Sequence, residues 1–308
     1  MTFPSFYDPS LVGTYYEPRT LEAVAAGKAT VTPAASQDEP RVLLLLVDPQ
    51  VDFIHTDGSL CVPGAVEDTR RTIEWLLVNL ERVTSIVASL DTHTPLQIFY
   101  PTWWVDRDGN HPGPFTPIAA EQVEAGGWIP TVEPEWSLNY VQQLEERAKK
   151  TLMIWPYHTM VGTPGHAITP ALYEAIVFHA AARNSQPTFI AKGSIPKTEH
   201  YSILEPEVKV PEVPLGGINQ PLLDMIATYD VIYIAGQAKS HCVLETVTSL
   251  VRYFGERNPE FITRWRLLED CMSSVAHPEI DFEALADEQL SRFEQLGLQR
   301  VRSSDPMR

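Results

Sequence analysis

Residues 41–47 read Arg41-Val-Leu-Leu-Leu-Leu-Val47, a run in which every residue after the first is apolar. A strand with one solvent-facing side alternates apolar and polar residues, whereas a strand covered on both faces is apolar throughout. No apolar run in the chain approaches the roughly 18 residues that indicate a membrane span. Residues 41–47 therefore predict a strand of a parallel sheet that has helices on both faces.

The same signal recurs along the chain, with amphipathic stretches between the apolar runs. Further runs predict strands at 84–90, 187–191, 231–235 and about 262–268. Apolar residues spaced three and four apart predict the helices, which are expected at about 65–82, 168–183, 218–229, 240–255 and 278–296. Because strands and helices alternate, we predict an α/β fold with three αβα layers and a mostly parallel central sheet.

Two segments lie outside this alternation. Residues 1–40 are rich in Pro, Ala, Ser and Thr and are predicted to form an extended N-terminal arm before a single domain at 41–308. Residues 95–150 hold four of the seven tryptophans and one helical stretch near 138–149. A structureless loop of that length is rare in a compact domain. We therefore expect an insertion folded onto the sheet edge, as a lid or an oligomer contact, with its aromatic residues used for packing.

The composition narrows the class of partner. The chain has 308 residues, of which 44% are hydrophobic and 20% charged, and its net charge is −17. This charge argues against nucleic acid and anionic membrane as partners, since both require a basic surface. The N-terminus lacks the basic and apolar regions of a signal peptide. The three cysteines are odd in number and widely spaced, which favours a reducing cytoplasm over a disulfide framework.

Reactive side chains follow four of the predicted strands. Asp48 follows the first, Asp91 and His93 follow the second, Lys192 follows the third, and Cys242 lies in the turn after the fourth. Parallel sheets place their ligands beyond the carboxyl ends of the strands. A helix N-terminus favours a thiolate, so Cys242 is a candidate nucleophile. Each residue alone has a plainer interpretation, as a turn residue, a surface charge or a small buried side chain.

Spacing adds one candidate metal site and leaves other choices open. Asp91 and His93 are two apart, so in an extended segment they face the same way and can bind one ion. Lys197 competes with Lys192, although it follows Pro196 and is expected in a loop. His241 adjoins Cys242, but neighbouring helix residues diverge, which argues against a Cys–His pair.

Together these residues resemble the isochorismatase-like cysteine hydrolases, and most closely their nicotinamidase branch. The matching motifs span about 41–275 apart from the insertion. They are Asp48-x-Gln-x-Asp-Phe53, Gly58-Ser-Leu-Cys-Val-Pro-Gly-Ala65, Asp91-x-His93, Trp155-Pro-Tyr-His158 with Gly162-Thr163, Lys192-Gly193, and Gly236-x-Ala-x-x-x-Cys-Val243-x-x-Thr246.

The resemblance implies a catalytic triad of Asp48, Lys192 and Cys242. In that family the acid takes the thiol proton and later activates water, the lysine holds the ion pair, and the cysteine attacks an amide carbon. It also implies an oxyanion hole formed by the N–H groups of Ala238 and Cys242, beside a cis peptide bond at Gln237–Ala238.

The resemblance also implies a metal site and a substrate pocket. Asp91, His93 and His158 map onto the nicotinamidase metal ligands, and Phe53 and Trp155 onto aromatic residues of the substrate pocket. An Asp–His–His set suits zinc, with iron, manganese or nickel as alternatives. The position of a fourth protein ligand, His111 included, stays open because the insertion separates the two halves of the site.

The expected function is therefore a cytoplasmic, nicotinamidase-like cysteine amidohydrolase that cleaves a small-molecule amide to acid and ammonia through a thioester. A homo-oligomer is also expected. Two alternatives stay open: hydrolysis of a carbamoyl or ureido compound, and a non-catalytic scaffold that binds through the tryptophan-rich insertion. Isochorismate hydrolysis is disfavoured because that branch lacks the cysteine. One departure is Lys239, which places an unusual charge near Cys242 where the family more often has Thr-Asp after the alanine.

Overall fold

The computed structural model describes residues 3–148 and 150–307. Within these residues the central sheet has six strands in the order β10-β9-β8-β1-β2-β7, and every neighbouring pair is parallel. The predicted α/β fold is confirmed. The strands are β1 (Val42–Val47), β2 (Ser85–Asp91), β7 (Thr188–Lys192), β8 (Val231–Gly236), β9 (Trp265–Leu268) and β10 (Gln299–Val301).

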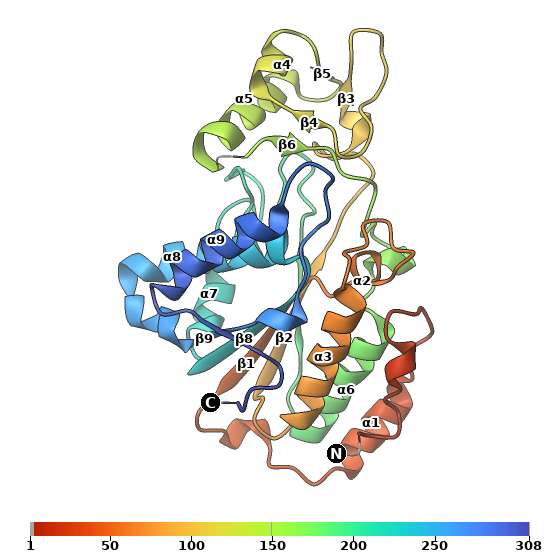
Figure 1. Ribbon diagram of the computed structural model, residues 1–308, viewed down its shortest axis with the longest axis vertical. Helices are drawn as coiled ribbons and strands as arrows, with labels where there is room; N and C mark the ends of the chain where they lie inside the picture. The colour runs from red at the N-terminus through yellow and green to blue at the C-terminus, as the bar shows by residue number, and fades with distance from the viewer. Residues whose placement is uncertain (1–2, 149, 308) are drawn as a thin grey trace.

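Helices cover both faces of the sheet, which explains why β1 is apolar throughout (Figure 1). Leu44 and Leu46 pack into the core on one face, and Leu43 and Leu45 pack into the core on the other. Successive side chains of a strand point to opposite faces, so both sets must be apolar. The first face carries α1 (Thr20–Ala29), α3 (Ala65–Val78) and α6 (Pro170–Arg183), and the second carries α7 (Gln220–Ile226), α8 (Leu244–Arg257) and α9 (Phe282–Glu294).

The N-terminal arm is not extended throughout, because residues 20–29 form α1. This helix packs so closely on α6 that a Cβ at Gly27 would lie 2.6 Å from the carbonyl oxygen of Phe178. Its small residues give no clear amphipathic pattern, so the apolar spacing that predicted the other helices is missing. The division between the arm at 1–40 and the domain at 41–308 stays a prediction.

The last two strands also differ from expectation. Residues 259–264 form a 3-10 helix, so β9 begins later than predicted. Pro259 begins that turn, where its missing N–H and fixed φ are tolerated. The three residues of β10 are too few for a periodic pattern, so no sequence signal predicted this edge strand.

The insertion forms a separate layer, called here the cap and defined as residues 98–155. Figure 1 shows it beyond the carboxyl ends of the strands rather than alongside an edge strand. It has its own hydrophobic cluster, in which Trp103 and Trp104 are buried, as expected for packing residues. Its elements are β3 (Trp104–Val105), β4 (Pro117–Ile118), α4 (Ala120–Glu124), β5 (Ile129–Pro130), α5 (Pro134–Gln143) and β6 (Leu152–Met153).

The state of the cysteines and the length of the helices relate to the expectations about disulfides and membrane spans. Cys61, Cys242 and Cys271 are all free thiols, so the odd, widely spaced cysteines form no disulfide framework. Among the residues described, no helix is long and apolar enough to cross a membrane.

Candidate active site

Four neighbouring strands bring the predicted residues to one end of the sheet. Asp48 directly follows β1, Asp91 ends β2, and Lys192 ends β7. Cys242 lies in the short π-helix Lys239–Val243, between β8 and α8. Asp91 and Lys192 are direct partners in the parallel pairing of β2 with β7. The topology therefore places the four side chains side by side. All four are buried.

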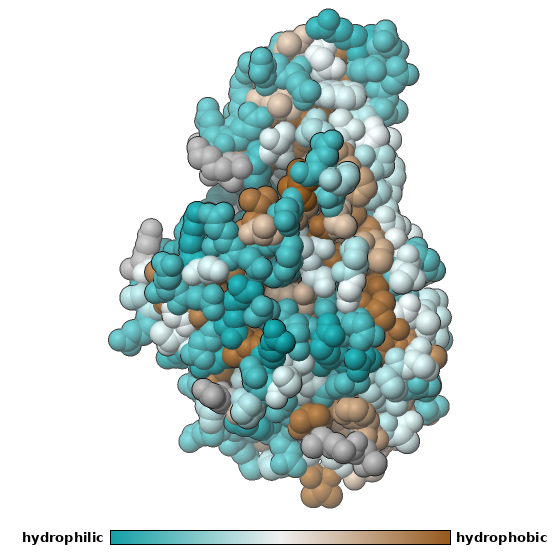
Figure 2. All heavy atoms as spheres, viewed as in Figure 1, coloured by the Kyte–Doolittle hydropathy of each residue, from teal (hydrophilic) through white to brown (hydrophobic). Residues whose placement is uncertain are grey.

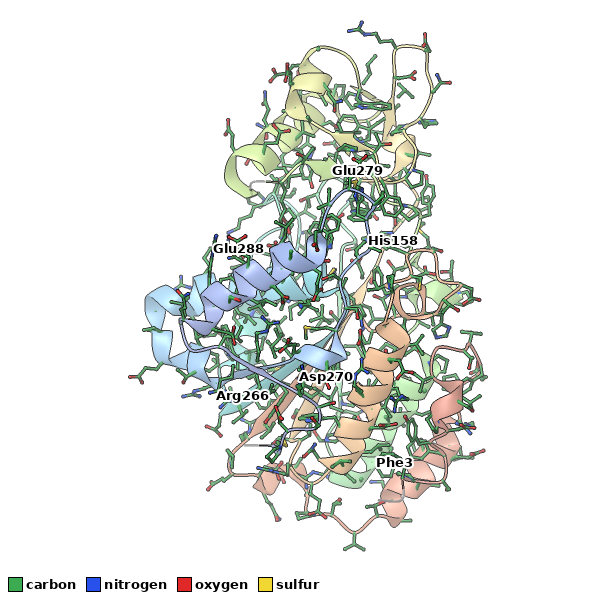
Figure 3. All side chains as sticks on the ribbon, viewed as in Figure 1. Phe3, His158, Arg266, Asp270, Glu279 and Glu288 are labelled. Carbon is green, nitrogen blue, oxygen red and sulfur yellow. The ribbon has the colours of Figure 1, made fainter. Side chains whose placement is uncertain are left out.

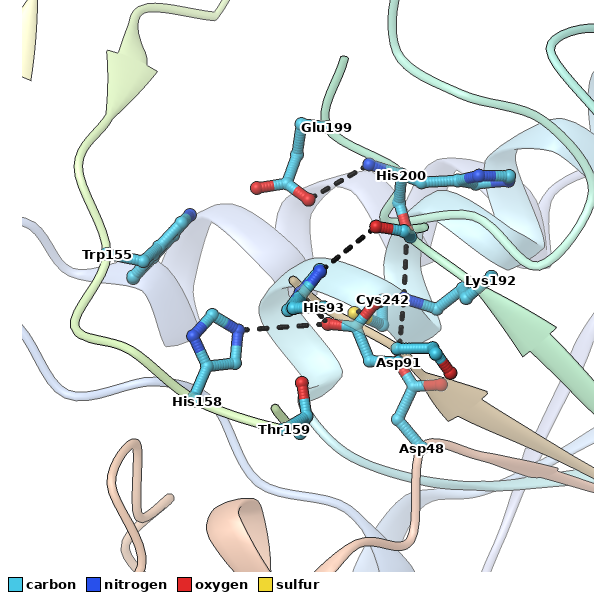
Figure 4. Close-up of polar contacts among 12 residues, drawn as sticks. Asp48, Asp91, His93, Trp155, His158, Thr159, Lys192, Glu199, His200 and Cys242 are labelled. Atoms are coloured by element: carbon cyan, nitrogen blue, oxygen red, sulfur yellow. Dashed lines mark hydrogen bonds and ion pairs between the residues drawn. The ribbon is translucent and has the colours of Figure 1, made fainter. Parts of the chain in front are cut away.

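Lys192 lies at the centre of this group (Figure 4). Its Nζ is 2.9 Å from Asp48 Oδ2, 2.9 Å from Asp91 Oδ1 and 3.5 Å from Cys242 Sγ, and it donates to the His200 carbonyl. Burial disfavours the ammonium, but Asp48 and Asp91 outweigh it and hold the pKa of Lys192 well above its usual range. Lys192 is therefore a permanent cation between two acids and a thiol.

Cys242 does not rest as a thiolate, contrary to the expectation from its helix N-terminus. Burial raises the pKa of its thiol well above the usual range, and the nearby carboxylates raise it further, while Lys192 only partly offsets them. Desolvation of the charged form therefore outweighs the helix dipole. The thiol keeps its proton until a base removes it.

Asp48 is placed to be that base. The Ser89 hydroxyl donates to its Oδ1 at 2.6 Å. Its Oδ2 receives no well-directed hydrogen bond from the described side chains despite the nearby Lys192, so a lone pair is open to the thiol proton. Burial raises the pKa of Asp48, although Lys192 opposes the rise. The rise makes the Asp48 carboxylate a stronger base than an exposed aspartate, which favours transfer.

The segment between β8 and α8 brings backbone N–H groups close to the Cys242 thiol. The peptide bond between Gln237 and Ala238 is cis, as the family resemblance implies. The Ala238 N–H has no acceptor within the described part of the chain, and both Ala238 and Cys242 line the pocket beside the thiol. An N–H pair at this position can stabilise a negative oxygen that forms next to the sulfur.

Asp91, His93 and His158 form a second buried group next to the first. Their ligand atoms all lie within 4.8 Å of one another. Asp91 Oδ2 is 2.8 Å from His93 Nε2 and 3.7 Å from His158 Nε2. Since the other oxygen of Asp91 meets Lys192, this carboxylate joins the thiol group to the histidine group.

The hydrogen bonds of the two histidines fit a metal site. His93 Nδ1 lies 3.1 Å from the Gly193 carbonyl, and His158 Nδ1 lies 2.7 Å from the Pro156 carbonyl. A carbonyl can only accept, so each Nδ1 carries a hydrogen, and Nε2 is the atom of each ring that can bind an ion. Without an ion, His93 Nε2–H donates to Asp91 Oδ2, and although burial opposes it, Asp91 raises the pKa of His93. Three electron-pair donors facing one point are chemically suited to a divalent cation.

Gly193 is required by this arrangement. Its φ is +79°, and a Cβ there would lie 2.5 Å from Asp91 Oδ1 and 2.8 Å from His93 Cε1. A side chain would therefore displace two members of the histidine group. This close approach explains the Lys-Gly pair at the end of β7.

Replacing His158 with alanine is expected to weaken metal binding at least about 100-fold, because even loss of a partner outside the first coordination shell costs 10- to 100-fold. Metal content would be measured by elemental analysis after dialysis against a weak chelator. The matched control is His111→Ala, since His111 bonds to the Trp104 carbonyl within the cap. Equal metal retention by the two variants would show that His158 is not a ligand.

The two predicted pocket aromatics lie beside the thiol. Phe53 and Trp155 line a pocket of about 30 Å³ together with Cys242 and Ala238. Phe53 packs against His158, with ring centroids 5.5 Å apart. Trp155 ends the cap and donates from Nε1 to the Tyr201 hydroxyl at 3.0 Å. The pocket therefore lies between the thiol group and the histidine group, with the cap on one side, and Figure 3 shows His158 near this junction.

Three supporting residues were not predicted. Gln50 accepts from the Asp91 N–H and donates to the Asp91 carbonyl. Asp52 accepts from the Thr159 N–H at 2.7 Å, and so holds the segment that carries His158. Ser89 bonds Asp48 from the neighbouring strand. Gln50 and Asp52 lie within the Asp48-x-Gln-x-Asp motif, which could have pointed to them. Ser89 lies in no motif, and only its place in the alternating side-chain pattern of β2 could have pointed to it.

Glu199 was also missed, because it lies in an irregular segment that matches no motif. Its carboxyl group is buried in the wall of the pocket and accepts from the His200 N–H at 2.9 Å. Burial raises the pKa of Glu199 to about 7, despite the opposing effect of His93. Figure 4 places it on the same side of the site as Trp155.

The residues that competed with Lys192 and Asp48 for a catalytic role lie outside the pocket or are bound to other groups. Lys197 pairs with Glu133 and Glu212 near the surface. His241 bonds to Ser240, and within the described residues it makes no hydrogen bond to Cys242. Lys239 has its charge neutralised by two carboxylates of α9, Glu283 and Asp287. The unusual charge near the nucleophile therefore ties the turn to α9 instead of entering the pocket.

Solved structures of known proteins superpose on this chain. No protein-family model and no curated sequence matches the chain. Among solved structures, the Acinetobacter baumanii nicotinamidase pyrazinamidase superposes with a TM-score of 0.56 at 19% identity, covering 87% of this chain and 99% of that one. Yeast nicotinamidase Pnc1p, bound to the inhibitor nicotinaldehyde, gives 0.57 at 16% identity, covering 85% and 99%. PnC1 from L. infantum, in complex with nicotinate, gives 0.51 at 18% identity, covering 89% and 96%.

Identities this low establish a shared fold and leave the substrate open. The similarity extends over nearly the whole of each solved chain. It also agrees with the all-parallel sheet order and with the motifs at the ends of the strands. The chain therefore has the α/β fold of these solved nicotinamidase structures.

Proposed function

We propose that the protein is a cysteine amidohydrolase that cleaves a small planar amide, nicotinamide or a close analogue, to an acid and ammonia. The observation that carries this proposal is the buried Cys242 thiol, 3.5 Å from a lysine that is itself paired with Asp48. A nucleophile, a base and a fixed cation within one buried pocket are what acyl transfer requires.

In the proposed reaction Asp48 removes the thiol proton as Cys242 Sγ attacks the amide carbon. The carbonyl oxygen becomes negative and is stabilised by the N–H groups of Ala238 and Cys242. The C–N bond then breaks, and the proton held by Asp48 goes to the departing nitrogen, which leaves as ammonia. Asp48 next deprotonates a water that attacks the thioester, and the thiolate leaves and takes that proton back.

Lys192 is proposed to balance the negative charge on Asp48 or Cys242 throughout these reaction steps. It carries no proton between groups, because its pKa lies well above the working range. Its ammonium stays between Asp48 and the sulfur and stabilises whichever of them is negative. The contacts of Lys192 with Asp48 and with the sulfur offset the cost of burying these charges.

Asp91, His93 and His158 are proposed to hold a divalent metal ion, with zinc first and iron, manganese or nickel as alternatives. When bound, the ion supplies a Lewis acid that can accept the lone pair of a ring nitrogen. Phe53 and Trp155 offer flat apolar surfaces to the ring. Together these groups favour a heteroaromatic amide over an aliphatic one.

Nicotinamide is expected to be hydrolysed up to about 10⁴-fold more efficiently than benzamide, because a site that relies on one polar contact strongly rejects an analogue lacking it. The measurement is kcat/KM for ammonia release on the metal-loaded protein, with metal content determined on the same preparation. Stripping the metal should remove most of this preference. Equal rates for the two amides, with metal present, would rule out recognition of the ring nitrogen.

The same assay separates the alternatives. Ammonia release from a carbamoyl or ureido compound, with none from nicotinamide, would keep the amidohydrolase and replace its substrate. Inactivity on every amide, together with an unreactive Cys242, would favour a scaffold that binds through the cap.

We also propose a reducing cytoplasm as the working environment, because all three cysteines are free thiols. The expected partners are the small-molecule amide and further copies of the chain. Nucleic acid and membrane remain disfavoured by the net charge of −17.

A further inference from the structure

The pocket beside Cys242 is too small for the substrate that the chemistry suggests. Its volume is about 30 Å³, which is room for one or two water molecules. A six-membered ring with an amide group needs several times more. A substrate must therefore extend from the thiol into neighbouring space.

A much larger cavity of about 440 Å³ adjoins this pocket. Cavities that bind small molecules usually measure about 300–1,000 Å³. The larger cavity lies between the cap, the first turn of α8 and α9, and Trp155, Glu199, Tyr201 and His241 line both spaces. These four side chains are thus a shared wall between the thiol and the cavity.

Three of the wall residues form an aromatic group held by its own contacts. Trp155 donates to the Tyr201 hydroxyl, and the His241 ring lies 5.4 Å from each of their ring centroids, edge to face. Burial lowers the pKa of His241 to about 3, so its ring is neutral. A ligand passing between the two spaces meets these flat, uncharged rings, and the fourth wall residue, Glu199, is an acid.

The rest of the cavity lining is mainly apolar. Leu144 and Met153 come from the cap, Leu244 from α8, and Phe282 and Leu285 from α9. On the face shown in Figure 2, hydrophobic residues gather where the cap meets the body above α9. The lining favours an uncharged apolar or aromatic group.

The one lysine of the lining does not change this conclusion. Lys150 Nζ lies 2.8 Å from Glu207 and 2.7 Å from Glu245, so its charge is neutralised. Another hollow, of about 580 Å³, follows the loop 272–283, but it shares only Val275 with the pocket at the thiol. The 440 Å³ cavity is therefore the better continuation of the active site.

We propose that the substrate is an amide with an apolar or aromatic extension, which occupies the 440 Å³ cavity while its carbonyl carbon reaches Cys242. This inference rests on the proposed amidohydrolase function and narrows its substrate class. The cap would then select the substrate, because it supplies one wall of the cavity.

The test compares nicotinamide with nicotinamides that carry a phenyl group at C4, C5 or C6. At least one phenyl derivative is expected to have a kcat/KM about tenfold or more above that of nicotinamide, since burying a phenyl group contributes more than the 1.4 kcal/mol that a factor of ten requires. Leu285→Asp, which puts a charge at the cavity wall, should reduce the kcat/KM of that derivative about tenfold through KM and lower the kcat/KM of nicotinamide much less.

Leu296→Asp is the matched control. Leu285 is 56% exposed and Leu296 is 51% exposed, so neither change disturbs the core, but Leu296 lies past the end of α9 and outside the cavity lining. This control should alter neither substrate. Hydrolysis of nicotinamide with rejection of all three derivatives, or an equal effect of Leu285→Asp on both substrates, would overturn the inference and leave the proposed function standing. Hydrolysis of none of the amides would overturn the proposed function and the inference with it.

Discussion

Replacement of Cys242 by alanine is expected to lower amide turnover by about 10⁴- to 10⁶-fold while the fold is retained, because no other group in the pocket can form the thioester. Cys61 and Cys271 cannot replace Cys242, since none of the described residues lining the pocket is another cysteine. The measurement is ammonia release, with thermal unfolding followed on the same protein.

Cys61→Ala is the matched control, and its turnover should equal that of the parent protein. A second measurement is mass analysis after an acid quench, which should find the acyl group on the peptide that contains Cys242. Turnover of the Cys242→Ala variant within tenfold of the parent protein would refute the nucleophile assignment. An acyl group on another cysteine would refute it as well.

Replacement of Lys192 by methionine is expected both to abolish turnover and to lower the free energy of unfolding by about 3–5 kcal/mol, the usual cost of leaving a buried charge without its partner. Lys192 is 3% exposed and pairs with two buried acids, Asp48 and Asp91. Urea unfolding at neutral pH measures the difference.

The stability loss should depend on pH in a definite direction. Without Lys192, burial leaves Asp48 with a folded-state pKa above its unfolded value, so the folded state binds more protons than the unfolded state. The free energy of unfolding then falls as the pH rises from the unfolded-state pKa of Asp48 to its folded-state pKa. The deficit of Lys192→Met should therefore be larger at pH 8 than at pH 5.

Lys197→Met is the control for this prediction. Lys197 pairs with two acids that are about half exposed, so its removal should change stability by at most about 1 kcal/mol. A loss for Lys192→Met no greater than this, or a deficit that grows toward pH 5, would show that the two buried acids do not depend on Lys192.

The sequence predicted the sheet and most of the site because both depend on local pattern. Every residue of β1 is apolar since both of its faces are covered. Parallel strands bring their carboxyl ends to one edge, so residues that follow different strands must lie close together. For this reason the approach of Asp48, Asp91 and Lys192 could be inferred without coordinates.

His158 could be inferred only through its motif. It follows the long cap, and no local rule determines where a chain returns after such a segment. The structure places it by contacts that are distant in sequence, above all the Thr159 N–H to the Asp52 carboxylate. Glu199 matches no motif and was found only in the folded chain, as was the cavity between the cap and α9.

The charge state of Cys242 also depends on the tertiary structure. The helix N-terminus visible in the sequence favours a thiolate, but the folded protein buries the sulfur beside two carboxylates, and its pKa rises well above the usual range. Burial is set by every layer packed around the residue, and no stretch of sequence records it. The sequence by itself therefore determined which groups meet at the end of the sheet. The tertiary structure decided which of them hold protons and how much room they leave for a substrate.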